Sequence, residues 1–423
     1  MSVSAAPLAG RSPKAKGMGS AVSMKNNTTR SSTTMGAAYF ISNEPSGNFV
    51  VAADINTDGS LTLSTATFTG GLGQHGNDGG ANGPDALFSQ GSVKANANAS
   101  LLAAVNTGSN TVSLFQIDPS DPSNLRAIGA PVSSGGEFPM SLAFNSAGSM
   151  LCVLNGGAVN GVQCFNTTDN FLGLKPIANS QRSLGLNQTT PATGPAGSTS
   201  HIIFSEDGSS LFAAVKGNPA LGDGARGFIA VWDVADDGSL STNFTNIPPP
   251  AKGNLPFALA NIPGTTNALF VPDAAVGVDI FDLSQGPERA AESNATQAVP
   301  VKGQGAVCWV AHSTKTGTFF VTDIMTALVT EIAVDGNLAG SVVKQYPTQT
   351  GAGTIDLEVA SLGGNDFLYV NMANATAIQA FSLPAKGQAT KTQTLDVAGP
   401  VKAAGLSISG ANVQGMTVFV KPQ

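Results

Sequence analysis

The sequence is poor in charged residues. Asp, Glu, Lys and Arg make up 11% of its 423 residues, against about 25% in an average soluble protein. Hydrophobic residues reach 42%, so the low charge does not indicate disorder, because the chain has enough apolar surface for a large core. The formal net charge is -7. With no basic stripe to displace counterions, the chain is not expected to bind nucleic acid or an anionic membrane surface.

Other features are also missing. No apolar run approaches 18 residues, so no helix is expected to span a membrane. Residues 1–35 contain no apolar h-region, so they do not form an intact signal peptide, and we interpret them as a flexible tail at the start of a mature chain. There is no G-x-S-x-G elbow, Walker A motif, H-E-x-x-H motif or Cys/His metal spacing. With only three dispersed His, we expect no metal and no other cofactor.

The sequence has only three cysteines, and two of them flank a predicted hairpin. In SMLCVLNGGAVNGVQCFN, two apolar runs surround a Gly/Asn-rich turn, which is typical of a β-hairpin. The turn centres on Ala158, which places Cys152 opposite Cys164 within disulfide range. The alternative is two small buried side chains. A disulfide would favour an oxidising compartment, whereas Cys308 has no partner and is expected in the core.

Glycine is abundant, with 50 residues, and a four-stranded unit recurs along the chain. The clearest copy, HIIFSEDGSSLFAAVKG followed by RGFIAVWDVADDGSL, alternates strands with DG turns. We predict six complete units, beginning with their innermost strands, at residues 85–118, 139–165, 201–240, 256–282, 306–335 and 356–382.

Incomplete units stand at both ends of the chain. Residues 39–64 have the second, third and fourth strands but lack the first, and residues 403–420 supply one or two unpaired strands. Pairing the two ends completes a seventh unit and removes the last open sheet edge. We therefore predict an all-β, seven-bladed β-propeller of four-stranded antiparallel blades, as a single domain over residues 36–423 and with a monomer as the default.

Acceptor sequons for N-glycosylation are numerous but close to the number expected by chance. Their asparagines mark predicted loops, and occupancy would require a secreted protein. The candidates are Asn26, Asn27, Asn98, Asn166, Asn187, Asn243, Asn294 and Asn374.

The repeat carries a family resemblance. SHIIFSEDGSSLFAAVKG, FIAVWDVADDGSL and NTGSNTVSLFQID resemble the seven-bladed lactonase family, which includes bacterial phosphogluconolactonases and fungal carboxy-cis,cis-muconate cyclases. The Gly-rich segments 83–110 and 183–215 most resemble secreted fungal proteins of the carboxymuconate cyclase-like type. The resemblance covers residue 38 to about residue 420. It implies a metal-independent, cofactor-free isomerase (an intramolecular lyase) or lactonase that is secreted and glycosylated, although no signal peptide is present in the chain.

Loops at one mouth of the central channel contain the candidate site residues. The resemblance places His, Arg and Glu there, and we assign the roles by loop position: His201 as acid/base, Glu137 as its partner or alternative, and His75 as a further candidate. Such groups can transfer one proton near neutral pH. Arg182 and Arg226 would bind substrate carboxylates bidentately. In the cyclase direction, a substrate carboxylate adds to a double bond and a protein acid protonates the adjacent carbon.

The sequence is compatible with three functions. The first is a cyclase or lactonase acting on a small carboxylated substrate such as muconate or muconolactone. The second is an enzyme of the same fold with another substrate, and the third is a secreted, non-catalytic propeller that binds glycan or protein. Convergence of His201, Glu137, Arg182 and Arg226 on one cavity would favour the first. The insertions at 70–84 and 176–200 are expected to narrow or reshape the channel mouth.

Overall fold

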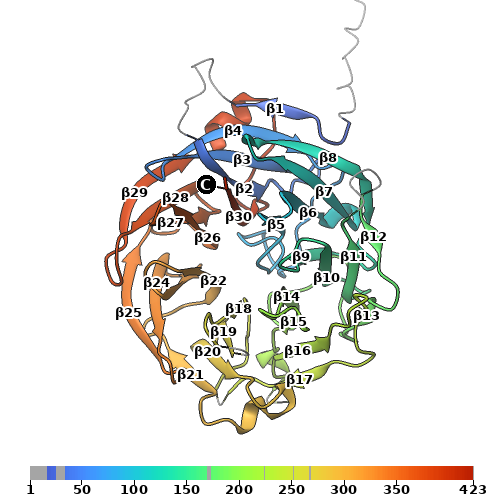
Figure 1. Ribbon diagram of the computed structural model, residues 1–423, viewed down its shortest axis with the longest axis vertical. Coiled ribbons are helices and arrows are strands. Elements are labelled where there is room, and N and C mark those ends of the chain that lie inside the picture. The colour runs from blue at the N-terminus through green and yellow to red at the C-terminus, as the bar shows by residue number, and fades with distance from the viewer. Residues whose placement is uncertain are drawn as a thin grey trace, which may run out of the picture.

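Seven sheets surround a central axis in the computed structural model, which describes residues 17–24, 34–168, 173–222, 224–250, 252–265 and 268–422 (Figure 1). The predicted seven-bladed β-propeller is therefore confirmed. The described part of the chain has one α-helix, α1 (Ala398–Ala403), and three short 3-10 helices, η1 (Thr107–Ser109), η2 (Pro219–Leu221) and η3 (Pro287–Glu292).

Six blades are built from consecutive strands, each running from the innermost strand outwards. Blade 2 consists of β5 (Val93–Asn96), β6 (Leu101–Asn106), β7 (Thr111–Asp118) and β8 (Asp121–Ser133). Blade 3 consists of β9 (Pro139–Phe144), β10 (Met150–Asn155), β11 (Gly161–Asn166), β12 (Lys175–Pro176) and β13 (Arg182–Ser183). Blade 4 consists of β14 (Thr199–Phe204), β15 (Ser210–Val215), β16 (Phe228–Asp233) and β17 (Thr245–Ile247). Blade 5 consists of β18 (Ala260–Asn261), β19 (Ala268–Asp273), β20 (Gly277–Asp282) and β21 (Gln297–Pro300). Blade 6 consists of β22 (Val307–Ser313), β23 (Thr318–Asp323), β24 (Leu328–Val334) and β25 (Gly340–Pro347). Blade 7 consists of β26 (Thr354–Leu362), β27 (Asn365–Met372), β28 (Ala377–Leu383) and β29 (Thr390–Asp396).

Blade 1 is assembled from both ends of the chain, as predicted. Strand β30 (Gln414–Val420) is its innermost strand and pairs antiparallel with β2 (Thr34–Ile41), which continues into β3 (Phe49–Asn56) and β4 (Leu61–Phe68). A fifth strand, β1 (Ala21–Ser23), pairs with the outer edge of β4. This strand lies within the predicted tail 1–35, and it covers an edge that would otherwise be open. Residues 1–16 and 25–33 of that predicted tail lie outside the described residues.

The strand–turn pattern follows directly from local sequence. In blade 4, Ile202, Phe204 and Leu211 are buried, and the turn between these strands is Asp207-Gly208. Gly208 has φ +76°, a conformation that a side chain would strain. Oδ1 of Asp207 accepts hydrogen bonds from the backbone N–H and the hydroxyl of Ser209, which is the turn chemistry expected of Asp.

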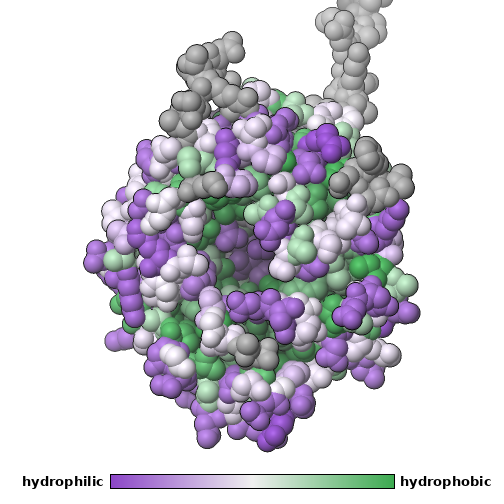
Figure 2. All heavy atoms as spheres, in the orientation of Figure 1, coloured by the Kyte–Doolittle hydropathy of each residue, from purple (hydrophilic) through white to green (hydrophobic). Residues whose placement is uncertain are grey.

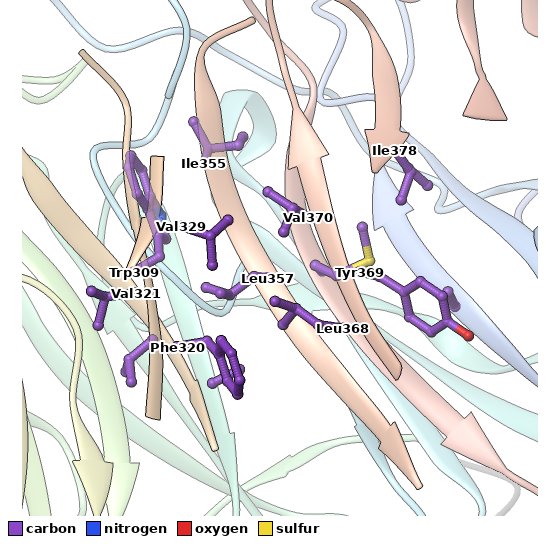
Figure 3. Close-up of a cluster of buried hydrophobic side chains, with 14 of the residues drawn as sticks. Trp309, Phe320, Val321, Val329, Ile355, Leu357, Leu368, Tyr369, Val370 and Ile378 are labelled. Atoms are coloured by element: carbon purple, nitrogen blue, oxygen red, sulfur yellow. The ribbon is translucent and has the colours of Figure 1, made fainter. Parts of the chain in front are cut away.

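The core lies between the blades. Figure 3 shows side chains of blades 6 and 7 meeting face to face, with Phe320 and Val321 on one side and Leu357 and Leu368 on the other. A similar layer joins blades 5 and 6, where the rings of Phe270 and Phe319 stack with centroids 4.1 Å apart. Because every blade buries both faces against its neighbours, a blade cannot be removed without exposing two apolar surfaces.

The predicted opposition of Cys152 and Cys164 in the β10–β11 hairpin is also confirmed. Of the two alternatives that the sequence leaves open, a disulfide or two small buried side chains, the structure has the disulfide. Cys308 is free and buried. Among the described residues, no helix is long and apolar enough to cross a membrane.

Candidate functional site

The central channel is closed in its middle by the segment Asp85–Ser92, which we call the plug. The Gln90 side chain pairs with the inner edge of blade 6 like a strand residue: its Nε2 donates to Val310 O (2.8 Å) and its Oε1 accepts from Val310 N (3.0 Å). Its backbone N donates to Ser200 O and its carbonyl accepts from the Ser141 hydroxyl. The plug therefore satisfies innermost strand edges that would otherwise stay unpaired.

Two buried ionisable side chains fasten the plug. Lys216 Nζ donates to Phe88 O (2.8 Å) and to Thr199 O (2.7 Å). Asp85 Oδ1 accepts a hydrogen bond of 2.6 Å from Gln414 Nε2 on strand β30. Burial lowers the pKa of Lys216 and raises the pKa of Asp85, and in each case the opposite charge of the other group opposes the shift. The Lys216 and Asp85 side chains therefore position the plug in the channel and do not face an open cavity.

A roof covers the plug on the side where the innermost strands begin. The insertion 70–84 and the segment 184–198 pair there, since Asn77 N donates to Ala192 O at 2.7 Å and the two segments share an isolated bridge. His75 is 8% exposed, and both ring nitrogens bond to carbonyl oxygens of its own loop. The insertions thus reshape this mouth, as expected.

Three other residues predicted to line this mouth form hydrogen bonds with protein groups around them. Glu137 accepts a hydrogen bond from the Thr190 hydroxyl. Arg182 lies on the outer strand β13 and donates to the carbonyl oxygens of Leu240 and Ser241. The Arg226 guanidinium donates to the carbonyl oxygens of Pro249, Pro250 and Gly253. All of these arginine hydrogen bonds therefore go to backbone carbonyl oxygens.

His201 lies on the innermost strand of blade 4 but is 2% exposed. Its Nδ1 accepts a hydrogen bond from Leu259 N at 3.0 Å, so Nε2 carries the proton in the neutral ring. Burial, and secondarily the positive charge of Lys94, hold the pKa of His201 well below its usual value. The ring is neutral and sealed under the plug residue Gly91, so the structure does not gather His201, Glu137, His75, Arg182 and Arg226 around one cavity.

Arg226 has a further neighbour, the buried carboxyl of Asp279. Burial and the adjacent negative charge of Asp273 raise the pKa of Asp279 to about 10, and Arg226 only partly opposes this shift. Asp273 accepts hydrogen bonds from the backbone N–H groups of Asn254 and Leu255, which marks it as the ionised member of the pair.

Asp279 predicts a pH dependence of stability. Its pKa is higher in the folded than in the unfolded state, so the folded state retains a proton that the unfolded state releases. The free energy of unfolding should therefore fall as pH rises from about 4 towards 10. The substitution Asp279→Asn removes this titration, and denaturant unfolding at pH 5, 7 and 9 should show a smaller loss than in the unmodified protein. Equal slopes for both proteins would contradict the assignment.

The opposite end of the channel is open. A hollow of about 310 Å³ is lined there by the C-terminal ends of the innermost strands of blades 2 to 5. Figure 2 shows a hollow at the centre of the ring with hydrophilic residues inside it. The lining includes Lys94, Asn96, Asn145, Ser146, Glu206 and Asn261. Among the described residues, no group of His, Cys, Asp and Glu is arranged to hold a metal ion.

An ion pair lies at this open end. Lys94 Nζ on β5 is 3.7 Å from Glu358 Oε2 on β26, and both side chains are about a quarter exposed (22% and 26%). Deeper in the channel, Asp356 Oδ2 accepts a hydrogen bond from Gly91 N of the plug at 3.2 Å. Burial raises the pKa of Asp356 to about 7, and Lys94 opposes the shift. We take Lys94, Glu358 and Asp356 with the hollow as the candidate site.

The sequence contains a signal for two of these residues. In TIDLEVASL, Asp356 and Glu358 alternate with apolar residues, a period that places both on one side of a strand. Carboxylates in a strand of such a charge-poor chain stand out. Both lie within a strand, so they are not among the loop residues that the sequence predicts as the site.

The fold defines the chain as a seven-bladed β-propeller, and the solved structures similar to it share that architecture. No protein-family model and no curated protein sequence matches the chain. A periplasmic gluconolactonase of Pseudomonas aeruginosa is similar with a TM-score of 0.61 and 16% identity, over 92% of this chain and 100% of that chain. A putative 6-phosphogluconolactonase of Bacteroides uniformis gives 0.56 and 15%, over 86% and 97%. A functionally unknown protein of Desulfotomaculum acetoxidans gives 0.59 and 12%, over 91% and 99%. At these identities the likeness is one of fold.

Proposed function

We propose that the protein hydrolyses a small lactone in the hollow. The observation that carries this proposal is the Lys94–Glu358 pair at the open end of the channel. Glu358 as general base takes a proton from the attacking water, and the Lys94 ammonium stabilises the negative charge that develops on the carbonyl oxygen. The ring C–O bond then breaks, and Glu358 returns the proton to the leaving oxygen. The product is the open hydroxy acid.

Two further observations support this proposal. Two solved structures similar in fold are described as a gluconolactonase and a putative 6-phosphogluconolactonase. The hollow is also within the range of small-molecule sites, about 300–1,000 Å³.

The cyclase reaction predicted from the sequence would use the same hollow. Carboxymuconate carries three carboxylates. Lys94 and Glu206 line the hollow, and Lys94 is already paired with Glu358 beside it and lies near the buried Asp356. One ammonium among these carboxyl groups holds at most one substrate carboxylate. A lactone with little negative charge therefore fits better than a tricarboxylate, and the muconate substrate is included in the assay as the second reaction.

A non-catalytic binding role is the second candidate. It is favoured by the absence of Lys216, Asp85, Arg182 and Arg226 from the lining of the hollow. Lys216, Arg182 and Arg226 donate to backbone carbonyl oxygens, and Asp85 accepts from the Gln414 side chain. A binding protein would still use the hollow, but Glu358 would then have no chemical step to perform.

Export of the protein is part of the proposal. A disulfide is typical of oxidising compartments, and one similar structure is described as periplasmic. All six sequon asparagines that the structure describes, Asn98, Asn166, Asn187, Asn243, Asn294 and Asn374, are exposed, as glycosylation requires.

Titration of released acid with glucono-1,5-lactone, corrected for spontaneous opening, tests the enzyme proposal. Glu358→Gln is expected to lower kcat/KM by about 100-fold or more, the usual contribution of a general base, and Lys94→Met to lower it as well. Glu292→Gln removes an exposed carboxylate of a surface ion pair and should leave the rate unchanged. Ultraviolet assays of muconolactone and carboxymuconate run in parallel. A folded protein that turns over none of these substrates would contradict the proposal and leave the binding role.

A further inference from the structure

A second cavity, of about 420 Å³, opens beside the hollow between blades 3 and 4. We call it the groove. It shares Asn145, Ser146 and Phe204 with the lining of the hollow, so the two cavities adjoin. The catalytic proposal above does not use the groove.

Polar groups of a particular kind line the groove. Three carboxylates, Asp207, Asp236 and Asp237, face amide and hydroxyl side chains, and no Lys, Arg or His is in the lining. The turn hydrogen bonds of Asp207 and Asp237 use Oδ1 of each, so their Oδ2 atoms can accept from a ligand. A lining that has carboxylate acceptors and no cationic side chain repels an anionic ligand. It suits a neutral ligand that carries many hydroxyl donors.

Apolar side chains interrupt this polar lining. Ile177, Phe204 and Met150 contribute to the same cavity. A sugar ring presents C–H surface as well as hydroxyl groups, so it can bury the former against apolar side chains while the latter bond to carboxylates and amides.

Asn166, at the end of β11, adds a second observation. It lines the groove, is exposed, and begins the sequon Asn166-Thr167-Thr168. Its Oδ1 accepts hydrogen bonds from the backbone N–H and hydroxyl of Thr168, and the amide nitrogen Nδ2 is the atom to which an N-glycan is attached. A glycan at this position begins at the groove.

We propose that the groove between blades 3 and 4 is a binding site for neutral carbohydrate. Such carbohydrate has two sources: the glycan attached to Asn166 in an exported chain, or a free oligosaccharide that reaches the same surface. The chemistry of recognition is the same for both, and the two sources are separated by experiment.

The attached source is tested with full-length protein from a glycosylating host. Hydrogen exchange of segments 145–149 and 234–238 should be slower in the glycosylated protein than in the Asn166→Gln variant. The matched variant Asn243→Gln removes an exposed sequon that does not line the groove, and it should retain the slow exchange.

The free source is tested with unglycosylated protein from a bacterial periplasm. Calorimetric titration uses the neutral tetrasaccharides cellotetraose, laminaritetraose, maltotetraose and mannotetraose, with trigalacturonate as the anionic comparator. At least one neutral compound should bind with a dissociation constant below about 1 mM. Ala235→Tyr fills the groove without touching the hollow and should weaken binding at least tenfold, whereas Ala147→Tyr, at an exposed position outside both linings, should not.

Either positive arm supports the proposal and names the source of the carbohydrate. It is overturned if exchange is the same with and without the glycan at Asn166 and no neutral tetrasaccharide binds, or if trigalacturonate binds as tightly as the neutral compounds. Glu358→Gln should leave tetrasaccharide binding intact, so failure of lactone hydrolysis and failure of carbohydrate binding are separate results.

Discussion

Ending the chain at Val413, which removes strand β30, is expected to abolish cooperative folding. Strand β30 is the innermost strand of blade 1 and pairs with β2. Its residues Met416 and Phe419 are buried, and Gln414 bonds to Asp85 of the plug. Losing two buried side chains costs about 1.5–3 kcal/mol each, and the ring also gains open edges. Together these losses are comparable with the total stability of a typical protein, about 5–15 kcal/mol.

Circular dichroism and thermal unfolding measure the result. The control ends the chain at Val420, which keeps β30 and removes only residues 421–423. This control should melt in one transition near the temperature of the full chain. A chain ending at Val413 that melts cooperatively within a few degrees of the control would show that ring closure contributes little to stability.

Gln90→Leu is expected to be the most destabilising single substitution in the plug. The Gln90 side chain satisfies both backbone groups of Val310, in a buried position. Leucine matches its size but leaves that N–H and C=O without partners, and each unsatisfied buried group costs about 1–3 kcal/mol. The melting temperature should fall by several degrees, and the Val310 amide should exchange faster with solvent.

The matched control is Gln349→Leu, at an exposed position in the loop between β25 and β26. It makes the same chemical change away from the channel and should shift the melting temperature by little. If Gln90→Leu shifted the melting temperature as little as this control, the hydrogen bonds between Gln90 and Val310 would contribute little to stability.

The fold was accessible from the sequence because its signals are local. Alternation of apolar residues and turns such as Asp207-Gly208 mark strands within a dozen residues. The opposition of Cys152 and Cys164 follows from counting outwards from a short turn, since hairpin register depends on loop length. Closure by β30 follows from the missing strand of the first unit.

The site was not accessible in the same way. The sequence predicts that His75, Glu137, Arg182 and Arg226 converge at one mouth of the channel, but their side chains bond separately to carbonyl oxygens or to a hydroxyl. The repeat predicts that the innermost strand of blade 2 begins at residue 85, whereas β5 begins only at Val93. Nothing local distinguishes a segment that enters the channel from one that joins its wall.

The sequence by itself determined the number of blades, the strand order and the opposition of Cys152 and Cys164, because these depend on periodicity and on short-range turns. Only the tertiary structure decided which end of the channel is open. That choice depends on long-range contacts, such as those of Gln90 with Val310 and of Asn77 with Ala192. The same ring brings Lys94 and Glu358 together from blades 2 and 7, more than 260 residues apart in the chain, where no local pattern relates them.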